Sequence, residues 1–407
     1  MADAQKDTFL VINCGSSSLK YEVFAMPQRE SLGKGQVERI GIAGGRLEQS
    51  STKGEICWEQ DVPDHENAAQ LVGKALVDQD SGILSDITEI SGVGHRVVHG
   101  GESYSQSVVI DDEVMKAIED NIELAPIHNP ANLSGIRATK ALLPKVPQVA
   151  VFDTSFHQTI PPSAYLYGIP RELYDKYKIR RYGFHGTSHR FVANEVIKFM
   201  KRSVDNTNVI SCHLGNGASI TAIQNGRSMD TSMGFTPLEG LVMGTRSGNL
   251  DPAVIFYLLE RGYTAEQLNV MLNKKSGVLG LSGISSDMRD LEEAAEQGNN
   301  RAIETLDVYA HRVRNYIGAY SANLVRVDIL AFTGGIGQFS VKMRERICHR
   351  LENLGIAIDN ERNRQVGTNP GIISTDYSPT SIVVMPTNEE LQIALDTYEL
   401  ARGVSAS

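Results

Sequence analysis

The sequence has few cysteines, and none of them stands in a paired spacing. Cys14, Cys57, Cys212 and Cys348 are the only four among 407 residues, and no two of them form a CxxC or another metal-binding pattern. This distribution argues against a disulfide framework and against a zinc site. We therefore expect four reduced thiols in a cytoplasmic protein.

The chain also lacks an excess of positive charge and any long apolar run. Its 39 basic residues are outnumbered by 49 acidic ones, and the net charge is -10. A general nucleic-acid surface is therefore not expected, whereas a local basic pocket for an anionic substrate remains compatible with the composition. No apolar stretch approaches the length that crosses a membrane, and residues 1–7 are polar without an apolar signal core. The sequence thus predicts neither nucleic acid nor membrane as a partner.

A polar turn between two apolar stretches lies near the start of the chain. The segment 13–20 reads NCGSSSLK, and Tyr21, Val23 and Phe24 follow it, which is typical of a β-hairpin. Its glycine allows a tight turn and a close approach to a ligand. Its hydroxyls, backbone N–H groups and lysine can hold phosphate oxygens. The turn is not a P-loop, because the GxxxxGKS/T pattern and a following helix are missing.

A second stretch repeats this design much later in the chain. The segment 209–220 reads VISCHLGNGASI, with the same Val-Ile-x-Cys opening, a glycine-rich turn and a returning strand to Ile223. Two similar hairpins so far apart indicate a duplicated architecture, with a chance echo as the alternative. A chain of this length, with 41% hydrophobic residues, can build two or more domains with separate cores. The sharpest change of composition falls just after Asp153.

The spacing of apolar residues outlines the remaining elements. It predicts helices over 65–78, 111–124, 132–143, 191–200 and 340–354, a mainly helical region over 253–324, and a last helix ending at Ala401. It predicts strands over 35–40, 45–49, 54–62, 149–152 and 382–385, and buried strands that run into glycine pairs at 100–101 and 334–335. A hairpin-led region is thus followed by a second hairpin-led α/β unit.

Two charged residues stand in apolar strand contexts and allow two interpretations each. Arg96 lies within the apolar stretch 90–98, where a buried charge needs a partner. It is either half of an internal salt bridge or a fork-shaped donor for a carboxylate or phosphate. Asp153 directly follows the strand 149–152, which is a frequent site position in open α/β sheets, but it could equally cap a turn or helix.

Three further segments favour anion or nucleotide binding. Residues 179–189 bring two arginines and two histidines together around glycines. Arg246 stands between small residues in 243–252, which indicates a loop that presents its guanidinium, with an ordinary solvated arginine as the alternative. The strand 328–333 runs into glycines, a pattern that places backbone N–H groups near a phosphate or nucleoside. Residues 285–289 carry capping Ser and Asp side chains at a helix start.

Taken in order, these motifs resemble the acetate and propionate kinase family over nearly the whole chain, from Val11 to about Ala401. The resemblance is carried by the segments 13–20, 94–101, 152–154, 181–189, 213–217, 244–248, 332–337 and 386–390. It implies an α/β fold of two ribonuclease-H-like domains, the type found in actin, Hsp70 and sugar kinases, with an interdomain cleft. We expect an N-terminal domain over 1–153, a nucleotide-binding domain over 154–386, and a C-terminal helix within 387–407 that packs back on the first domain.

The reaction implied by the resemblance is the reversible transfer of the γ-phosphoryl group of ATP to acetate, giving ADP and acetyl phosphate. It implies Mg²⁺, with Mn²⁺ as the alternative ion, and a homodimer. Phosphoryl transfer depends on positioning and charge neutralisation more than on covalent chemistry. The acceptor is already a carboxylate, so no strong general base is needed. Direct in-line transfer is the simpler route, and a phospho-enzyme through a His or Glu stays open.

The resemblance also implies roles for individual residues. Asp153, His185 and Arg246 would be catalytic, the latter two by stabilising the equatorial oxygens of the transition state. Arg96 and His128 would bind the acceptor carboxylate, and Asn13 and Glu389 would sit at the metal as oxygen ligands. An apolar pocket for the acyl methyl would be formed by Val98, Ile127, Phe184 and Pro237.

The remaining implied contacts concern the phosphates and the nucleoside. In the first hairpin, Ser16, Ser18 and Lys20 would contact phosphate. In the second domain the phosphate contacts would be His213, Leu214, Gly215, Asn216 and Gly217. The nucleoside contacts would be Asp287, Met288, Arg289, Gly335, Ile336, Gly337, Gln338 and Phe339.

Two positions depart from the family's pattern. The family usually reads GGIGEN where this chain has Gln338 and Phe339 after Gly337, and it usually has Leu at the position of Ile127. The first departure keeps another donor, such as pyrophosphate, as an alternative. Propionate is an alternative acceptor, because one methylene in an apolar pocket discriminates by only about 1–3 kcal/mol. A non-catalytic nucleotide-binding regulator would not need Arg96, His185 and Arg246 together.

Overall fold

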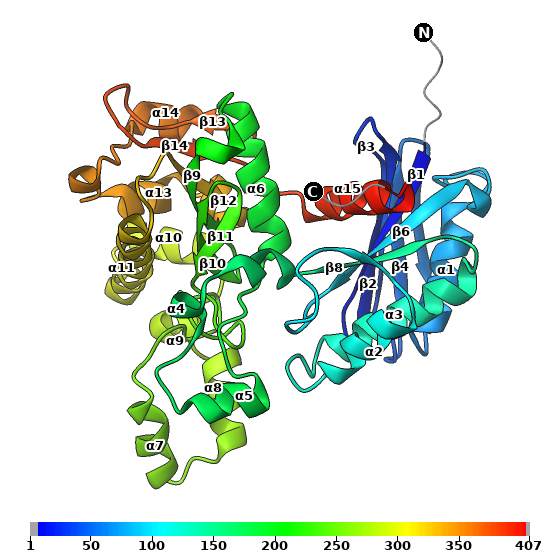
Figure 1. Ribbon diagram of the computed structural model, residues 1–407, viewed down its shortest axis with the longest axis horizontal. Coiled ribbons are helices and arrows are strands. Elements are labelled where there is room, and N and C mark those ends of the chain that lie inside the picture. The colour runs from blue at the N-terminus through cyan, green and yellow to red at the C-terminus, as the bar shows by residue number, and fades with distance from the viewer. Residues whose placement is uncertain (1–6, 404–407) are drawn as a thin grey trace. The chain divides into compact units, whose positions relative to one another are not determined.

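The structure is a computed structural model that describes residues 7–403. It divides the chain into two compact units, Met1–Phe156 together with Asn388–Ser407, and His157–Thr387. Both units are α/β and each is built on one sheet, as Figure 1 shows. The ends of the expected domains, residues 1–6 and 404–407, lie outside the described residues. No helix within 7–403 combines the length and the apolar character needed to cross a membrane.

The first unit contains an eight-stranded sheet with the order β5-β4-β3-β2-β1-β6-β8-β7. Its predicted hairpin is present, since β1 and β2 pair antiparallel with Asn13 opposite Lys20. The meander continues antiparallel through β5, whereas β6 and β8 join parallel on the other side of β1. The strands are β1 Asp7–Cys14, β2 Ser18–Met26, β3 Glu30–Glu38, β4 Arg46–Ser51, β5 Gly54–Glu59, β6 Ile90–Val97, β7 Val108–Val109 and β8 Gln148–Phe152.

Helices pack on both faces of this sheet because side chains alternate along β1. Leu10 and Ile12 belong to the core shared with α1 and α3, whereas Phe9 and Val11 belong to the core shared with α15. The close approach of α15 also explains the glycines of β6, because a Cβ on Gly94 would lie 2.4 Å from the hydroxyl of Thr397. The helical elements are α1 His65–Leu76, η1 Ile87–Glu89, α2 Asp112–Asp120, α3 Asn129–Leu142, η2 Ser155–Thr159 and α15 Glu389–Ala401.

The second unit contains a six-stranded sheet with the order β11-β10-β9-β12-β14-β13. A hairpin of β9 and β10 is again flanked by an antiparallel strand on one side and two parallel strands on the other. The sequence β3-β2-β1-β6-β8 of the first sheet therefore corresponds strand by strand to β11-β10-β9-β12-β14, and the predicted duplication is confirmed. The strands are β9 Asn208–Leu214, β10 Ala218–Gln224, β11 Arg227–Thr231, β12 Ile329–Thr333, β13 Gly371–Ile372 and β14 Ser381–Val384.

The second sheet also carries helices on β9 and its neighbours. α6 packs on β9 and β12, and the long helix α11 packs on β10 and β9. The helical elements of this unit are α4 Pro162–Tyr165, α5 Arg171–Tyr177, α6 Gly186–Phe199, η3 Val204–Asn206, α7 Ala253–Glu260, α8 Ala265–Lys274, α9 Gly277–Ser282, α10 Met288–Glu296, α11 Asn300–Asn323, α12 Gly334–Phe339, α13 Val341–Cys348, η4 Glu352–Leu354 and α14 Asn360–Gln365.

Several boundaries differ from the sequence-based expectation for local physical reasons. α3 begins at Asn129 rather than 132, because Pro130 fits the first turn of a helix, where its missing N–H is not needed. α6 begins at Gly186 rather than 191, directly after His185, which takes a left-handed backbone with φ 58°. The glycines after β12 form the first turn of the short helix α12.

Candidate active site

The guanidinium of Arg96 and the carboxylate of Asp153 form a two-pronged ion pair in the first unit. Nη2 lies 2.6 Å from Oδ2 and Nε lies 3.1 Å from Oδ1, while Nη1 lies 3.5 Å from Oδ1 of Asn13. Because β6 and β8 are parallel neighbours, both residues stand near the carboxyl ends of their strands. Asp153 is 2% exposed and Arg96 is 26% exposed. The internal salt bridge is therefore present, and the guanidinium keeps an accessible face.

Glu389 adds a second carboxylate beside this ion pair, at the start of α15. Burial raises the pKa of Glu389 to about 7, Arg96 opposes that rise, and the charge of Asp153 adds to it. The charges of Asp153 and Glu389 raise the pKa of Arg96, and Asp153 is the main cause. The carboxylates of Asp153 and Glu389 and the amide oxygen of Asn13 are hard oxygen donors. Their incompletely balanced negative charge fits a small divalent cation.

No group of three or more His, Cys, Asp or Glu side chains within 7–403 is arranged as a metal cage. Mg²⁺ does not need such a cage, because it keeps several waters and usually takes one or two carboxylates from the protein. Asn13, which does not count among those residue types, could offer a further protein oxygen.

The turn of the first hairpin is tied to β6 by a residue that the sequence patterns did not single out. Asn132 of α3 donates to the carbonyl oxygen of Cys14 at 3.0 Å and accepts from the backbone N–H of Val98 at 3.1 Å. Its side chain is buried. The amide thereby holds the serine-rich turn against the strand that carries Arg96. No periodicity marks such a contact, because it joins segments far apart in the sequence.

The hairpin turn itself presents polar groups at its surface. Ser16 and Lys20 are exposed, and Ser18 is half-buried. The backbone N–H of Gly15 donates to the carbonyl oxygen of Ser18 at 2.8 Å, which closes the turn. The placement keeps the predicted phosphate contacts accessible.

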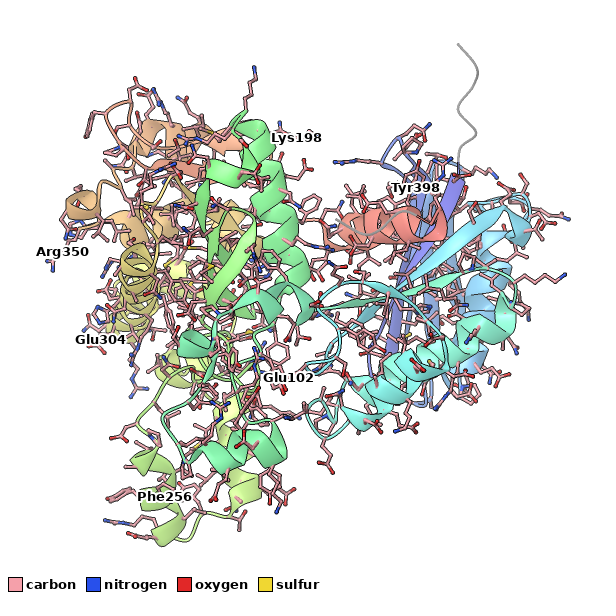
Figure 2. All side chains as sticks on the ribbon, viewed as in Figure 1. Glu102, Lys198, Phe256, Glu304, Arg350 and Tyr398 are labelled. Carbon is pink, nitrogen blue, oxygen red and sulfur yellow. The ribbon has the colours of Figure 1, made fainter. Side chains whose placement is uncertain are left out.

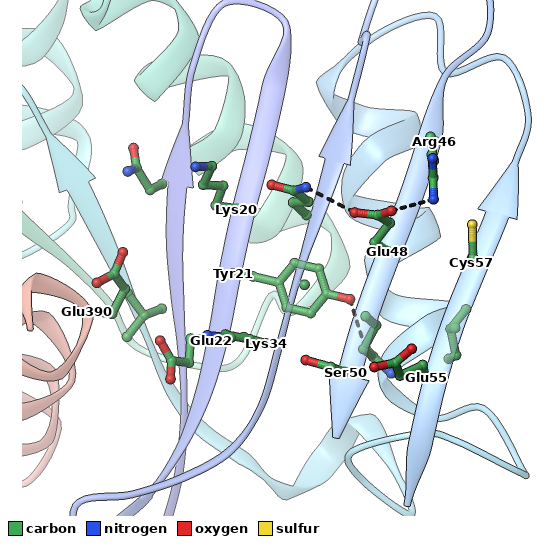
Figure 3. A pocket seen from close by; sticks show the side chains of 16 residues that line it. Lys20, Tyr21, Glu22, Lys34, Arg46, Glu48, Ser50, Glu55, Cys57 and Glu390 are labelled. Atoms are coloured by element: carbon green, nitrogen blue, oxygen red, sulfur yellow. Dashed lines mark hydrogen bonds and ion pairs between the residues drawn. The ribbon is translucent and has the colours of Figure 1, made fainter. Parts of the chain in front are cut away.

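A hollow of about 830 Å³ lies over the strands β1 to β5 of the same sheet (Figure 3). Asn13, Lys20 and Glu390 line it together with charged side chains of β2 to β5, including Lys34 and Glu48. Its charges are of both signs, and Arg46 pairs with Glu48 at 2.5 Å. This hollow was not predicted from the sequence, because its residues alternate with core residues along ordinary strands.

The predicted acceptor residues differ in their environments. Val98 is nearly buried and Ile127 is 65% exposed, and both belong to the first unit. His128 is exposed just before α3. In the second unit Phe184 is buried, and Pro237 is half-buried with its carbonyl oxygen accepting from Arg246.

Arg246 and His185 converge on Gly217, in the turn between β9 and β10 of the second unit. A Cβ added at Gly217 would lie 2.8 Å from Nη2 of Arg246 and 3.4 Å from Nε2 of His185. Nη1 of Arg246 donates to the carbonyl oxygen of Pro237 at 2.8 Å, and burial lowers the pKa of this guanidinium. Arg246 is therefore a held, half-buried cation and not an ordinary solvated arginine.

The same turn borders a second hollow, of about 500 Å³. Met288, Ile336 and the 61% exposed ring of Phe339 give it apolar walls. Asp287 caps α10 and pairs with Arg289 at 2.6 Å, and these bonds lower the pKa of Asp287 to about 2. The residues lining the hollow are Gly215, Asn216, Ser286, Asp287, Met288, Arg289, Glu292, Gly335, Ile336, Phe339 and Ser340.

Some residues that line this hollow were not predicted, and some of the predicted nucleotide contacts do not line it. Ser286, Glu292 and Ser340 line the hollow and were not predicted. The amide of Gln338 donates to the carbonyl oxygen of Thr368 at 3.0 Å, and neither Gln338 nor Gly337 is among the residues of the wall. His213 and Leu214 also lie outside it. A helical turn directs successive side chains to different sides, so neighbours of Phe339 face elsewhere.

The duplicated fold and these two groups of side chains define a phosphotransferase-like α/β protein of the ribonuclease-H-like type. A profile of the acetokinase family matches residues 8–395. The chain is 53% identical over 400 residues to an acetate kinase of Treponema denticola, covering 97% of this chain and 99% of the relative. It is 54% identical over 392 residues to an acetate kinase of Clostridium botulinum, covering 96% and 98%. The chain belongs to the acetokinase family.

Solved structures agree with this assignment. The acetate kinase of Porphyromonas gingivalis superposes with a TM-score of 0.94 at 45% identity, covering 97% of this chain and 99% of that one. A propionate kinase of Francisella tularensis superposes with a TM-score of 0.90 at 40% identity and the same coverage. The family resemblance and the fold predicted from the motifs are thereby confirmed.

Proposed function

We propose that this protein is an acetate kinase that reversibly transfers the γ-phosphoryl group of ATP to acetate. The convergence of Arg246 and His185 on Gly217, beside a hollow with apolar walls, is the observation that carries the proposal. Two donor groups that meet at a glycine leave room for phosphate oxygens against the backbone. The near-complete coverage of relatives named acetate kinase supports the choice of acceptor.

In the first unit, Arg96 would bind the carboxylate of the acceptor. Asp153 fixes the guanidinium by two hydrogen bonds, so that its planar fork is held before the acceptor arrives. One acetate oxygen then attacks the γ-phosphorus, and the bond from that phosphorus to the oxygen bridging to the β-phosphate breaks as ADP leaves. No proton has to be removed from the nucleophile, which agrees with the absence of a dedicated base in this proposal.

In the second unit, Arg246 would neutralise charge on the phosphoryl group during transfer, and His185 would donate a hydrogen bond to it. Arg246 is held by the carbonyl oxygen of Pro237, and His185 is held through its Nδ1 edge by Ser219 at 2.9 Å. Donors that are fixed beforehand need no reorganisation when charge develops, and this is the main source of stabilisation in such reactions. Direct in-line transfer follows as the proposed course.

Asn13 and Glu389 would hold Mg²⁺, or Mn²⁺ in its place, and Asp153 would orient Arg96 and the water shell of the ion. Bound there, the ion would supply positive charge that offsets the charge of the phosphates. Ionised Glu389 is favoured by such an ion, which opposes the effect of burial on its pKa.

The nucleoside would occupy the hollow lined by Met288, Ile336 and Phe339. An exposed aromatic ring beside two apolar side chains offers a stacking surface for a purine base. This stacking surface favours ATP over pyrophosphate as the donor, because pyrophosphate has no purine ring that could stack on it.

We also propose that two copies of the chain associate through α7. Its sequence AVIFYLLE has no buried residue, and Phe256 is 65% exposed and projects from the helix (Figure 2). Val254, Tyr257 and Leu259 are exposed as well, and such a concentration of exposed apolar side chains on one helix is characteristic of an interaction site. Light scattering would give twice the mass of 44.5 kDa for the wild type, and a single-chain mass would refute this assignment.

The free thiols of all four cysteines fit a reducing cytoplasm.

A hydroxamate assay of acyl phosphate formation tests the function directly. Acids of one to four carbons would be combined with ATP, GTP and pyrophosphate. We expect the highest kcat/KM with acetate and ATP. A higher value with propionate would reassign the acceptor, and no acyl phosphate with ATP would overturn the proposed donor.

A further inference from the structure

A series of four hydrogen-bonded side chains leads from the half-buried His185 into the second unit. Nδ1 of His185 lies 2.9 Å from Oγ of Ser219, and that oxygen lies 2.8 Å from Nε2 of His189. Nδ1 of His189 in turn lies 2.9 Å from Oγ of Ser211. Ser219, His189 and Ser211 are fully buried. This series of hydrogen bonds therefore ends in the protein interior, and only its first member, His185, reaches the turn at Gly217.

Secondary structure places these groups together. Ser211 of β9 and Ser219 of β10 share a sheet face, since Ser219 stands opposite His213 and Ser211 stands two residues before His213. α6 packs on this sheet at β9 and β12. His185 precedes its first residue and His189 follows one turn later, so both rings face the same hydroxyl. The backbone of His185 is left-handed, with φ 58°, and its ring contacts Ser219 of β10.

Counting donors and acceptors selects one direction of donation along this series of hydrogen bonds. Within the described residues, His189 is the hydrogen-bond partner of the Ser211 hydroxyl, so Ser211 must donate to Nδ1 of His189. His189 is neutral, because burial lowers its pKa well below the ordinary value. Its single proton is therefore on Nε2 and is donated to Ser219. The Ser219 hydroxyl is then satisfied only if it donates to Nδ1 of His185.

The other arrangements each strand a buried hydroxyl hydrogen. Reversing the whole chain leaves the hydrogen of Ser211 without an acceptor. Protonating Nδ1 of His185 leaves the hydrogen of Ser219 without one. Buried donors without acceptors are costly. Two titratable groups face this histidine: the nearby cation Arg246, which shares the contact with Gly217, and His213, whose ring lies 4.4 Å from that of His185.

We propose that Ser219 and His189 are positioning residues that hold neutral His185 with its proton on Nε2, directed at Gly217. The inference rests on the proposed function, in which phosphoryl oxygens are bound at that turn. Nε2 is the edge of the ring that lies near a Cβ position on Gly217, so the fixed proton is a hydrogen-bond donor toward the phosphate. His185 can then donate at neutral pH without becoming an imidazolium.

Two pairs of variants separate positioning from stability. Ser219→Ala deletes the hydroxyl that contacts His185, and Thr221→Val deletes a buried hydroxyl on the same strand that contacts Thr231 instead. His189→Gln can still reach Ser219 through its amide, whereas His189→Asn can reach only Ser211. We expect Ser219→Ala and His189→Asn to lower kcat by about 10- to 100-fold, the usual effect of losing a partner that orients a functional histidine. KM for ATP should change less than about threefold, since uniform binding is retained.

Thr221→Val and His189→Gln should keep kcat within about threefold of the wild type at a similar loss of thermal stability. Equal kcat losses in Ser219→Ala and Thr221→Val, or in the two His189 variants, would overturn the assignment. The paired design remains decisive if Ser219→Ala does not fold, because the His189 pair and the spectrum of the wild type do not depend on it.

Nitrogen NMR of the histidine-labelled wild type, with His185→Gln for assignment, reads the tautomer without any assay. We expect the signals of neutral His185 protonated at Nε2. An Nδ1-protonated or cationic ring at pH 7.5 would refute the inference. If the wild type made no acyl phosphate but showed this tautomer, the proposed function would fail and the hydrogen-bond chain would stand.

Discussion

Arg344, which is 1% exposed, donates from Nη1 to the carbonyl oxygen of Gln338 at 2.6 Å. The same nitrogen donates to the carbonyl oxygen of Gly337 at 3.0 Å, and Nε donates to the side chain of Asn363 at 2.6 Å. Gly337 and Gln338 belong to the last turn of α12, whose carbonyl oxygens have no partners within the helix. A buried cation therefore fixes the short helix that brings Ile336 and Phe339 to the second hollow.

Removal of this cation should affect both stability and nucleotide binding. Arg344→Met leaves buried carbonyl oxygens unpaired, and we expect a loss of about 2–4 kcal/mol in the free energy of unfolding. KM for ATP should rise while kcat changes little, because α12 carries no reacting group. Urea unfolding and steady-state kinetics measure the two effects. Arg346→Met, two residues away and partly exposed, is the control and should cost less than about 1 kcal/mol. Equal effects of both variants would contradict the role of Arg344.

Arg246→Ala tests the charge neutralisation at Gly217. We expect kcat to fall by about 10²–10³-fold, the usual effect of losing one fixed donor to a transition state. The fold should survive, since the side chain is half-buried and its hydrogen bond to Pro237 involves one carbonyl oxygen. Acyl phosphate formation and thermal melting provide the measurements. Arg227→Ala removes an exposed arginine of the same unit and should leave kcat unchanged. Wild-type turnover in Arg246→Ala would remove this residue from the mechanism.

The role of Arg96 is best tested by a substitution that keeps its charge, because Asp153 would otherwise remain buried without a partner. Arg96→Ala should cost about 3–5 kcal/mol of stability for that reason. Arg96→Lys keeps the charge but cannot form the two-pronged contact with Asp153. We expect it to raise KM for acetate by about tenfold or more and to slow turnover, with little change in KM for ATP. An unchanged KM for acetate would show that Arg96 does not bind the acceptor.

Glu389 should give the stability a pH dependence that Mg²⁺ changes. Its pKa is raised from 4.5 to about 7 in the folded protein. The folded state therefore binds more protons between these values, and stability falls as pH rises from about 4.5 to 7, by on the order of 1–2 kcal/mol after allowance for partial exposure. Glu389→Gln should remove this slope and stabilise the metal-free protein at pH 8.

Mg²⁺ favours the ionised carboxylate, so its stabilising effect should grow over the same pH range in the wild type only. Melting temperatures from pH 5 to 8, with and without Mg²⁺, would reveal both effects. The same slope in wild type and Glu389→Gln would assign the titration to another group.

Phe339→Ala tests the stacking surface for the base. Aromatic stacking on a base contributes about 1–3 kcal/mol, so KM for ATP should rise about fivefold or more. Gln338→Ala is the matched neighbour, since its amide binds the carbonyl oxygen of Thr368 and does not line the hollow. It should leave KM for ATP within about twofold. Identical KM values for the two variants would place the base elsewhere.

Local patterns in the sequence carried much of this description. The two hairpins, the buried strands before Asp153 and Gly334, and the mainly helical region over 253–324 follow from apolar spacing and glycines, and the structure contains them. The repeated opening of residues 11–14 and 209–212 indicated the duplication that the two strand orders confirm. Helix ends were less accurate, because His185 and Pro130 begin or join helices through backbone conformations that composition does not reveal.

The sequence by itself determined the family, the duplicated α/β architecture and the residue types available for phosphate and carboxylate binding, because these depend on short-range order along the chain. Only the tertiary structure decided which partner each of these residues has. It paired Arg96 with Asp153, turned Gln338 away from the hollow, placed Asn132 behind the first hairpin, and linked His185 to Ser219 and His189. Such contacts join side chains from strands and helices distant in sequence, and sheet register and helix packing bring them within hydrogen-bonding distance.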